Sequence, residues 1–410
     1  MNRVRQIVPA ALGPDRFLKD RAGLYDALKA EKFDASLYSS AFNPYPIAVS
    51  ASHYAELREL QSALREVLKA IVQNFFTDSR IRDVIALKEP EMALLREVET
   101  LPYRMGSFRP DILYAADGTP LISEVNARFP INGYLASAIL NRVVQKHMGL
   151  DPLPGMVELE NYLAERLGPS GLIGIVRSSE PGWDIHLLKQ WWPGQCVSRP
   201  PESVTESEMA RWGSLVLELA QEEIVSAFEP PVRTALVKHP HLLNDVRTIL
   251  IVHDKRLLSL ISRSPVIDDY VSVDLIARVR RHTVPTWVKG LHSDEMSRAE
   301  AEGDWIAKPP RSGKGRGIIV SRGLERREWA QTLRQLPPDW IVQPYVEQLQ
   351  FPVCHMVEEQ LVTENMNLVG LLPAIDDHPF GCGLFRASAS PIVNVARGGA
   401  ILAPYLERST

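Results

Sequence analysis

Apolar and polar positions along the chain form patterns that change from one region to the next. The first pattern has a helical period within residues 52–76, where charged residues lie opposite a stripe formed by Leu57, Leu60, Leu64 and Leu68. Such a stripe predicts an amphipathic helix. We therefore expect residues 1–105 to form a mainly helical N-terminal region.

The second pattern is a short strand pair. Two apolar-rich runs, DILYAA and PLISEVNA, flank the sequence DGTP, and together they span residues 109–126. An Asp-Gly pair between two such runs is typical of a tight hairpin turn. Helices are predicted next over residues 132–149 and 156–168, because each apolar pattern ends at a glycine. We assign the hairpin and the first of these helices to one segment, residues 106–150.

Strands and helices alternate in the middle of the chain. The run GLIGIVRSS, residues 171–179, is typical of a buried strand, and the alternation continues to about residue 252. This order predicts a small, partly parallel α/β domain over residues 151–252.

The last part of the chain is rich in strands and glycine turns. Short helices are expected over residues 253–261 and 293–302, and strand patterns dominate from residue 303 onward. We predict that residues 253–410 form a further domain, and that the whole protein is of the α+β or α/β class.

Composition narrows the choice of partners and compartment. The chain of 410 residues is 45% hydrophobic and 23% charged, with a net charge of −4, so nothing indicates a nucleic-acid or anionic-membrane surface. Its cysteines, Cys196, Cys354 and Cys382, form no C-x-x-C pair, which argues against a zinc site and a disulfide framework. No signal peptide or membrane-spanning run is evident. We expect a cytoplasmic protein with neither nucleic acid nor membrane as partner.

The predicted hairpin carries an unusual set of polar residues. Arg109 and Asp111 share one face of the first strand, and Glu124 and Asn126 share one face of the second. Closing the hairpin brings both pairs to the same end. Two carboxylates and an amide oxygen form an all-oxygen ligand set that suits Mg²⁺. A strand face with an internal ion pair to Arg109 is the alternative interpretation.

A glycine loop joins two later strands. In the sequence DWIAKPPRSGKGRGIIV, a strand presents Lys308, and Gly313, Gly315 and Gly317 follow it at alternate positions. Such glycines allow backbone N–H groups to approach an anion closely. The sequence is not a Walker A motif, and a solvated basic turn is an equally good interpretation of the loop alone.

Several other polar residues have ordinary interpretations when each is taken alone. Arg177 follows a buried strand and could bind a substrate carboxylate, but we favour a structural salt bridge. We interpret His253 as a surface or hydrogen-bonded core residue, and Trp191 and Trp192 as core. Arg128 is close enough to Asn126 to face a phosphate or an acid substrate.

Taken together, these motifs resemble the ATP-grasp superfamily of carboxylate–amine ligases. The R-x-D and E-x-N pair is similar to the metal-binding signature of that family, with Asp111, Glu124 and Asn126 as the ligands. Lys255 in HDKRLL and Lys308 in WIAKPP resemble its two phosphate-binding lysines. The resemblance implies ATP and Mg²⁺ as cofactors, with two metal ions, or Mn²⁺ in their place.

Further positions complete the resemblance. The loop SGKGRG is similar to the glycine loop over the phosphates, which implies roles for Ser312, Gly313, Gly315 and Gly317. The run IVQPYVE resembles the adenine-binding hinge, and it implies nucleotide contacts by Gln343, Tyr345, Val346 and Glu347. The segment from Arg386 through Asn394 to Gly398 and Gly399 resembles the strand that precedes the metal hairpin.

The order of the motifs departs from most of the superfamily, in which the lysines come first. Here the hairpin precedes them, as in the circularly permuted branch that includes glutathionylspermidine synthetase-like proteins and peptide ligases of natural-product pathways. The resemblance implies a permuted ATP-grasp core with a pre-ATP-grasp-like α/β domain and a helical N-terminal extension.

The resemblance also implies a reaction. A substrate carboxylate would take the γ-phosphate of ATP, and an amine would displace phosphate from the acyl phosphate to leave an amide. Arg109, Arg128 and Arg386 are then the candidate catalytic residues, placed near the transferred oxygens. Partners would be small acids and amines or peptides, with a homodimer as a further expectation. A phosphotransferase on the same scaffold and a non-catalytic nucleotide-binding protein are the alternatives.

Overall fold

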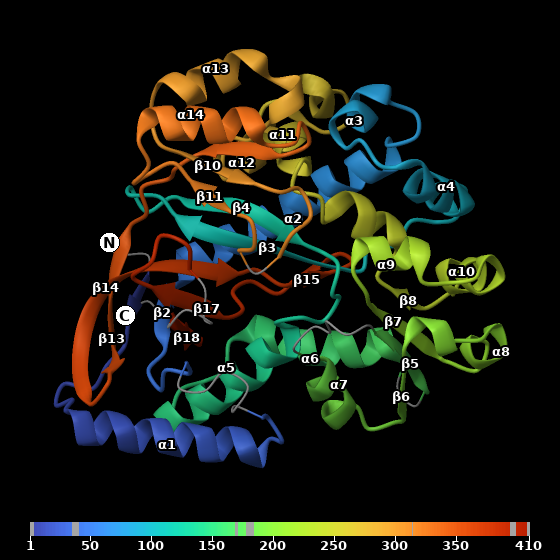
Figure 1. The fold of residues 1–410 in the computed structure, drawn as a ribbon. Helices are drawn as coiled ribbons and strands as arrows, with labels where there is room; N and C mark the ends of the chain where they lie inside the picture. Colours follow the sequence, from blue (N-terminus) through green and yellow to red (C-terminus); the bar gives the residue numbers. More distant parts are fainter. Residues whose placement is uncertain are drawn as a thin grey trace.

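The computed structural model describes residues 4–34, 41–168, 171–177, 184–313, 315–393 and 399–407. These residues form four sheets with helices packed between and around them, which confirms the predicted mixed class (Figure 1). In this described part of the chain, no helix has both the length and the apolar character needed to cross a membrane.

The predicted hairpin lies inside the largest sheet. This eight-stranded sheet has the order β16-β15-β3-β14-β17-β18, with β4 paired to β3 and β13 paired to β14. Its strands are β3 (Ser107–Tyr114), β4 (Pro120–Asn126), β13 (Gln350–Val357), β14 (Gln360–Leu371), β15 (Ala374–Ile375), β16 (His378–Pro379), β17 (Phe385–Ser388) and β18 (Ala400–Leu402). The early hairpin is therefore paired directly with strands from the C-terminal part of the chain.

A smaller antiparallel sheet faces the hairpin from above in Figure 1. It has the order β11-β10-β12-β9, from β9 (Trp287–Val288), β10 (Trp305–Lys308), β11 (Ile319–Val320) and β12 (Ile341–Pro344). The helices α13 (Ser293–Ala301) and α14 (Arg326–Gln335) cover its outer side. Trp287, Trp305 and Trp329 build a separate small core here.

The predicted α/β domain is a parallel four-stranded sheet of the order β6-β5-β7-β8. The strands are β5 (Ile173–Arg177), β6 (Cys196–Arg199), β7 (Ser214–Glu218) and β8 (Leu242–Leu243). The helices of this region are α7 (Ile185–Trp191), α8 (Glu206–Met209), α9 (Gln221–Ser226) and α10 (Pro230–Val237), with the 3₁₀ turn η2 (Pro201–Ser203).

Two predicted helices join this domain to the large sheet. They are α5 (Tyr134–Met148) and α6 (Pro154–Leu167), and they lie below the large sheet in Figure 1. Gly149 ends α5 in the left-handed conformation at φ 67°, which confirms the predicted stop signal.

The N-terminal region is helical, as expected, but it also supplies strands that the hydrophobic pattern did not indicate. Its helices are α1 (Pro14–Ala30), α2 (Ala51–Gln73), α3 (Ser79–Val84) and α4 (Glu89–Val98). The strands β1 (Val4–Gln6) and β2 (Ile47–Ser50) form a sheet with β19 (Pro404–Glu407). The two ends of the chain thus share one sheet, which a reading of local patterns could not reveal.

The predicted helix over residues 253–261 begins later than expected. A π-helical segment, η3 (Thr248–Val252), leads into a turn, and α11 (Leu257–Ser262) follows it. Lys255 therefore lies in the turn rather than on the helix. The remaining elements of this stretch are η4 (Pro265–Asp269), α12 (Val273–Arg281) and η5 (Lys289–Leu291).

Candidate active site

The hairpin aligns its polar residues in two facing pairs. In the β3–β4 register, Asp111 is paired with Glu124 and Arg109 with Asn126. The register shifts immediately after Asp111, so Ser123 is an extra, bulged residue. A bulge of this kind bends the strand locally and redirects its side chains, and bulges are common beside active sites.

Asp111 is buried, with 2% of its surface exposed, and two guanidinium groups bind it. Arg109 Nε donates to Oδ1 at 3.1 Å, and Arg386 Nη2 donates to Oδ2 at 2.6 Å. Arg386 comes from β17 and reaches Asp111 across β14, which lies between the two strands. Burial works to lower the pKa of Arg109, yet the adjacent Asp111 carboxylate raises that pKa above its ordinary value.

The carboxylate of Glu124 lies on the side of the hairpin that faces the opposing sheet. Asn126 Nδ2 donates to Glu124 Oε1 at 3.2 Å, and Lys255 Nζ lies 3.6 Å from Oε2. Burial alone would raise the pKa of Glu124, but the ammonium groups of Lys255 and Lys308 lower it to about 2. Glu124 is therefore ionised at neutral pH.

The two lysines come from other segments, Lys308 from the opposing sheet and Lys255 from the turn before α11. Lys308 ends β10, and its Nζ lies 3.5 Å from the carbonyl oxygen of the bulged Ser123. Lys255 is fixed at both ends, because its backbone N–H donates to Pro310 at 2.9 Å and its Nζ donates to the carbonyl of Ser312. Burial lowers the pKa of Lys308 to about 8, and the nearby Lys255 acts in the same direction.

A cavity of about 770 Å³ separates the two layers. The polar part of its wall includes Arg109, Asp111, Glu124, Asn126, Arg128, Lys308, Gln343 and Arg386. Apolar side chains from four different strands form another part of the wall, namely Leu113, Ile306, Val369 and Ile401. A wall with both polar and apolar parts is typical of a site for an amphiphilic small molecule.

Comparisons with known proteins agree with this architecture. A sequence model of the AnkG N-terminal domain matches residues 60–251. The ATP-grasp enzyme ankG of Aspergillus thermomutatus is 23% identical over 443 aligned positions, which cover 89% of this chain and 88% of that protein. A solved structure described as a glutathione synthetase-like effector (GSS30) from Globodera pallida, in apoform, is 11% identical, with a TM-score of 0.59 over 97% of this chain and 98% of its own.

The structure has a glutathione synthetase-like fold, and the comparisons support an ATP-grasp, glutathione synthetase-like superfamily for the chain. The superfamily resemblance stated from the motifs is thus confirmed, and so is the fold that it implied.

Most of the site residues predicted from the ATP-grasp motifs line the same cavity. Besides the hairpin residues, they are Arg128, Lys308, Gly313, Gly315, Gln343, Tyr345, Val346 and Arg386. Arg128 extends toward the glycine loop, since a methyl group added at Gly313 would lie 3.2 Å from its Nη2. Gly315 has a φ of 70°, a conformation that side chains disfavour, so the loop needs glycine there.

Four of the predicted residues lie outside the cavity wall in the described structure. Lys255 and Ser312 lie behind it and contact each other, and Gly317 lies near the side chain of Pro309. Glu347, predicted to contact a ribose, is largely exposed and forms an ion pair with Arg322.

The hinge residues have partners of their own. Gln343 is buried, and its Nε2 donates to Thr286 Oγ1 at 2.8 Å. The guanidinium of Arg322 lies over the Tyr345 ring at 4.4 Å. Asn394 and Gly398, the later part of the motif that starts at Arg386, fall outside the described residues.

One interpretation from the sequence finds no support among the described residues. We expected Arg177 to form a structural salt bridge, but across the described part of the chain no carboxylate forms an ion pair with it. Arg177 instead lines the cavity. The sequence also did not indicate the apolar wall, because Leu113, Ile306 and Val369 look like ordinary strand core.

Proposed function

We propose that the protein is an ATP-dependent ligase that joins a carboxylate substrate to an amine through an acyl phosphate. One observation supports this most directly. Four cations, on Arg109, Lys255, Lys308 and Arg386, surround the carboxylates of Asp111 and Glu124, an excess of two positive charges beside the cavity. A polyphosphate anion would balance that excess, since buried charges need partners.

The donor set also suits Mg²⁺. Asp111 and Glu124 offer carboxylate oxygens. Asn126 donates from Nδ2 to Glu124, which leaves the amide oxygen of Asn126 free to bind a cation. Among the described residues, no three Cys, His, Asp or Glu side chains converge into a metal cluster. A divalent cation would therefore bind here together with the phosphates, and when bound it would neutralise charge on the transferred phosphoryl group.

The residues divide the chemistry between them. Lys308 and Arg386 would hold the phosphates while a carboxylate oxygen of the substrate bonds to the γ-phosphorus and the bond to ADP breaks. The amine nitrogen would then attack the acyl carbon, the bond from that carbon to the phosphate oxygen would break, and the amine proton would leave to solvent. The glycine loop at Gly313 and Gly315 lines the cavity and would limit hydrolysis of the intermediate.

Phosphate release with and without hydroxylamine tests the proposal. Purified protein is incubated with Mg²⁺-ATP and pools of amino acids and short peptides, and phosphate and hydroxamate are measured. Hydroxylamine traps an acyl phosphate as a hydroxamate, so a ligase gives both products with one particular acid. Phosphate transfer without a hydroxamate would indicate a phosphotransferase. Nucleotide binding without turnover of any pool would favour a non-catalytic role.

The Asp111→Asn variant tests the site itself. It should lose most Mg²⁺-dependent phosphate release, because the change removes the carboxylate charge that Arg109 and Arg386 share. Asp294→Asn, at an exposed position on α13, is the matched control. Equal rates for both variants would contradict the assignment. We further propose small acids and amines or peptides as the substrates, with a homodimer to be checked by light scattering.

A further inference from the structure

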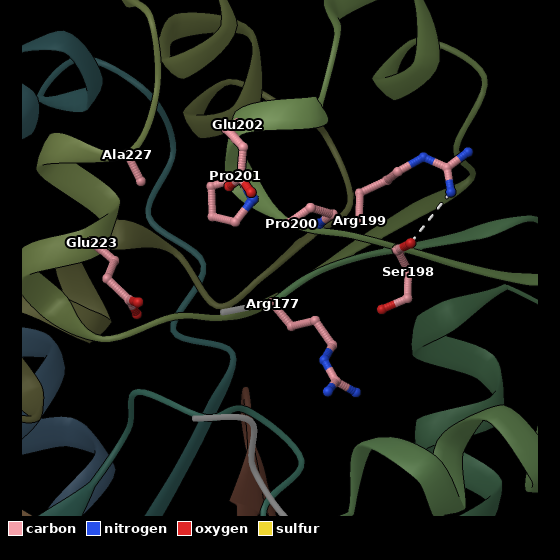
Figure 2. A pocket seen from close by; sticks show the side chains of 8 residues that line it. All are labelled: Arg177, Ser198, Arg199, Pro200, Pro201, Glu202, Glu223 and Ala227. Carbon is pink, nitrogen blue, oxygen red and sulfur yellow. Dashed lines mark hydrogen bonds between the residues drawn. The ribbon is translucent and has the colours of Figure 1, made fainter. Parts of the chain in front are cut away.

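A second cavity, of about 440 Å³, lies at the edge of the parallel sheet (Figure 2). It is bounded by the end of β5 at Arg177, the end of β6, the η2 turn with Glu202, and α9 with Glu223. Arg177 also lines the main cavity, and it is the residue that the two walls have in common. The small domain therefore presents one side chain to both spaces.

The topology of the sheet places this cavity where ligands bind in many α/β proteins. In the order β6-β5-β7-β8, β6 lies on one side of β5, and the next strands along the chain, β7 and β8, lie on the other side. The strand order thus reverses next to β5. Open parallel sheets bind ligands beyond the carboxyl ends of their strands at such a reversal. Arg177 is the last residue of β5 and is paired with Glu218, the last residue of β7.

Arg177 is positioned for a partner that the described residues do not supply. Figure 2 shows its guanidinium pointing away from Glu202 and Glu223. The other arginine of this cavity, Arg199, is engaged differently, because its Nε donates to Glu208 at 3.1 Å. In the described residues, no carboxylate forms an ion pair with Arg177.

The charge of Arg177 acts on two further basic side chains. Burial lowers the pKa of both His186 and Lys189, and the charge of Arg177 lowers each further. Asp34 acts to raise the pKa of His186, and Cys196 acts to raise the pKa of Lys189. Arg177 and His186 both line the main cavity, where a carboxylate would accept charge-assisted hydrogen bonds from the guanidinium.

We propose that Arg177 binds a carboxylate of an amino-acid or peptide substrate, distinct from the carboxylate that is phosphorylated, at the boundary of the two cavities. This inference rests on the proposed ligase function and names its substrate class. The carboxylates of Glu202 and Glu223 line the smaller cavity, so its lining also matches an ammonium group on the same ligand. A zwitterionic substrate satisfies both kinds of charge.

Equilibrium binding tests this assignment without catalysis. Calorimetry measures the binding of free amino acids and dipeptides, each compared with its C-terminal carboxamide, with and without a non-hydrolysable ATP analogue. The wild-type protein should bind at least one acid about tenfold or more tightly than its amide. Arg177→Gln should abolish that difference and leave binding of the ATP analogue unchanged, and Arg177→Lys should restore only part of it.

The control is Arg211→Gln, which makes the same charge change at an exposed position of the same domain. It should bind like the wild type. The inference is overturned if Arg177→Gln keeps the preference for the acid, or if the wild-type protein shows no such preference with any compound. A wild-type protein that does not bind the ATP analogue would instead contradict the proposed function. The comparison of acid with amide does not need the nucleotide, so the two failures can be distinguished.

Hydroxylamine turnover then identifies which substrate carries the carboxylate. With hydroxylamine as the amine, only the acid substrate can contact Arg177. A rise of about tenfold in the KM for the acid in Arg177→Gln would assign the carboxylate to the acid. An unchanged KM for the acid, together with a raised KM for the natural amine, would assign it to the amine. If neither KM changes, the inference fails.

Discussion

Two buried ionic clusters lie side by side in the chain, and they differ in how their charges are balanced. The closed cluster contains Glu91, Asp254, Arg256 and Arg311. Arg256 binds Asp254 through Nε at 2.9 Å and Nη2 at 2.7 Å, Arg311 Nε binds the same carboxylate at 3.0 Å, and Arg311 continues to Glu91. Two carboxylates thus meet two guanidinium groups, with no excess of charge.

The open cluster begins one residue later, at Lys255, and includes Asp111, Glu124, Lys308 and Arg386. Its three cations outnumber its two carboxylates, Arg109 raises the excess to two, and Lys255 is 3.6 Å from Glu124 rather than in a short ion pair. Apart from Lys255, the residues of the open cluster line a cavity, whereas the closed cluster packs between α4 and the turn before α11.

The comparison separates a structural role from a functional one by charge balance. A balanced, hydrogen-bonded cluster stabilises the protein, and breaking it leaves a buried charge without a partner. An unbalanced cluster beside a cavity is incomplete until a ligand supplies the missing charge. Perturbing each cluster should therefore affect different measurements.

The largest expected effect is on the closed cluster. Asp254→Asn should lower the free energy of unfolding by about 3–5 kcal/mol, because Arg256 and Arg311 lose a shared buried carboxylate. Urea denaturation followed by circular dichroism measures the loss. Glu59→Gln, which breaks an exposed ion pair with Arg278, is the control and should cost less than about 1 kcal/mol. Similar losses for the two variants would remove the distinction.

The open cluster should show the opposite behaviour. Glu124→Gln should reduce Mg²⁺-dependent phosphate release by about 100-fold, since it removes a carboxylate at the reacting phosphates. Its unfolding free energy should fall by less than that of Asp254→Asn, because the Glu124 side chain is 28% exposed whereas that of Asp254 is fully buried. A large loss of stability with full activity would reverse the roles of the two clusters.

A further buried carboxylate, that of Asp184, extends the comparison, because it has no ion pair among the described residues. Asp184 Oδ2 accepts from the backbone N–H of Ala136 in the first turn of α5, at 3.0 Å, and burial raises the pKa of Asp184 to about 7. The folded state therefore holds this proton more tightly than the unfolded state, whose pKa is near 3.8. Stability is favoured at low pH and is lost as the pH rises toward 7.

We expect this loss to amount to about 3–4 kcal/mol between pH 4 and pH 7.5. Asp184→Asn cannot titrate and should flatten that part of the pH profile of unfolding. An Asp184→Asn profile parallel to that of the wild type would show that other groups cause the dependence.

The smallest expected effect concerns nucleotide binding. Burial lowers the pKa of Lys308 to about 8, so this ammonium is protonated below pH 8 and neutral above it. A phosphate ligand prefers the charged form, and its affinity should fall as the pH rises. We expect binding of an ATP analogue to weaken about tenfold from pH 7 to pH 9 in calorimetry. Lys308→Arg should remove that dependence, because arginine stays protonated.

Much of the fold was decided by local patterns. The leucine stripe predicted α2, the Asp-Gly turn predicted the β3–β4 hairpin, and Gly149 predicted the end of α5. These features depend on residues that are neighbours in the chain. The spacing of the polar residues on the hairpin was readable for the same reason, because side chains two apart share a strand face.

Other features depend on residues that are distant in the chain, so the tertiary structure alone decided them. The pairing of β1 and β2 with β19, the reach of Arg386 to Asp111 across β14, and the bulge at Ser123 all require partners brought together by folding. The same holds for Asp254 and Lys255. These neighbours look alike as charged residues in a turn, yet the folded chain places one in a balanced cluster and the other beside the cavity, because the charge around a buried group is set by every segment packed against it.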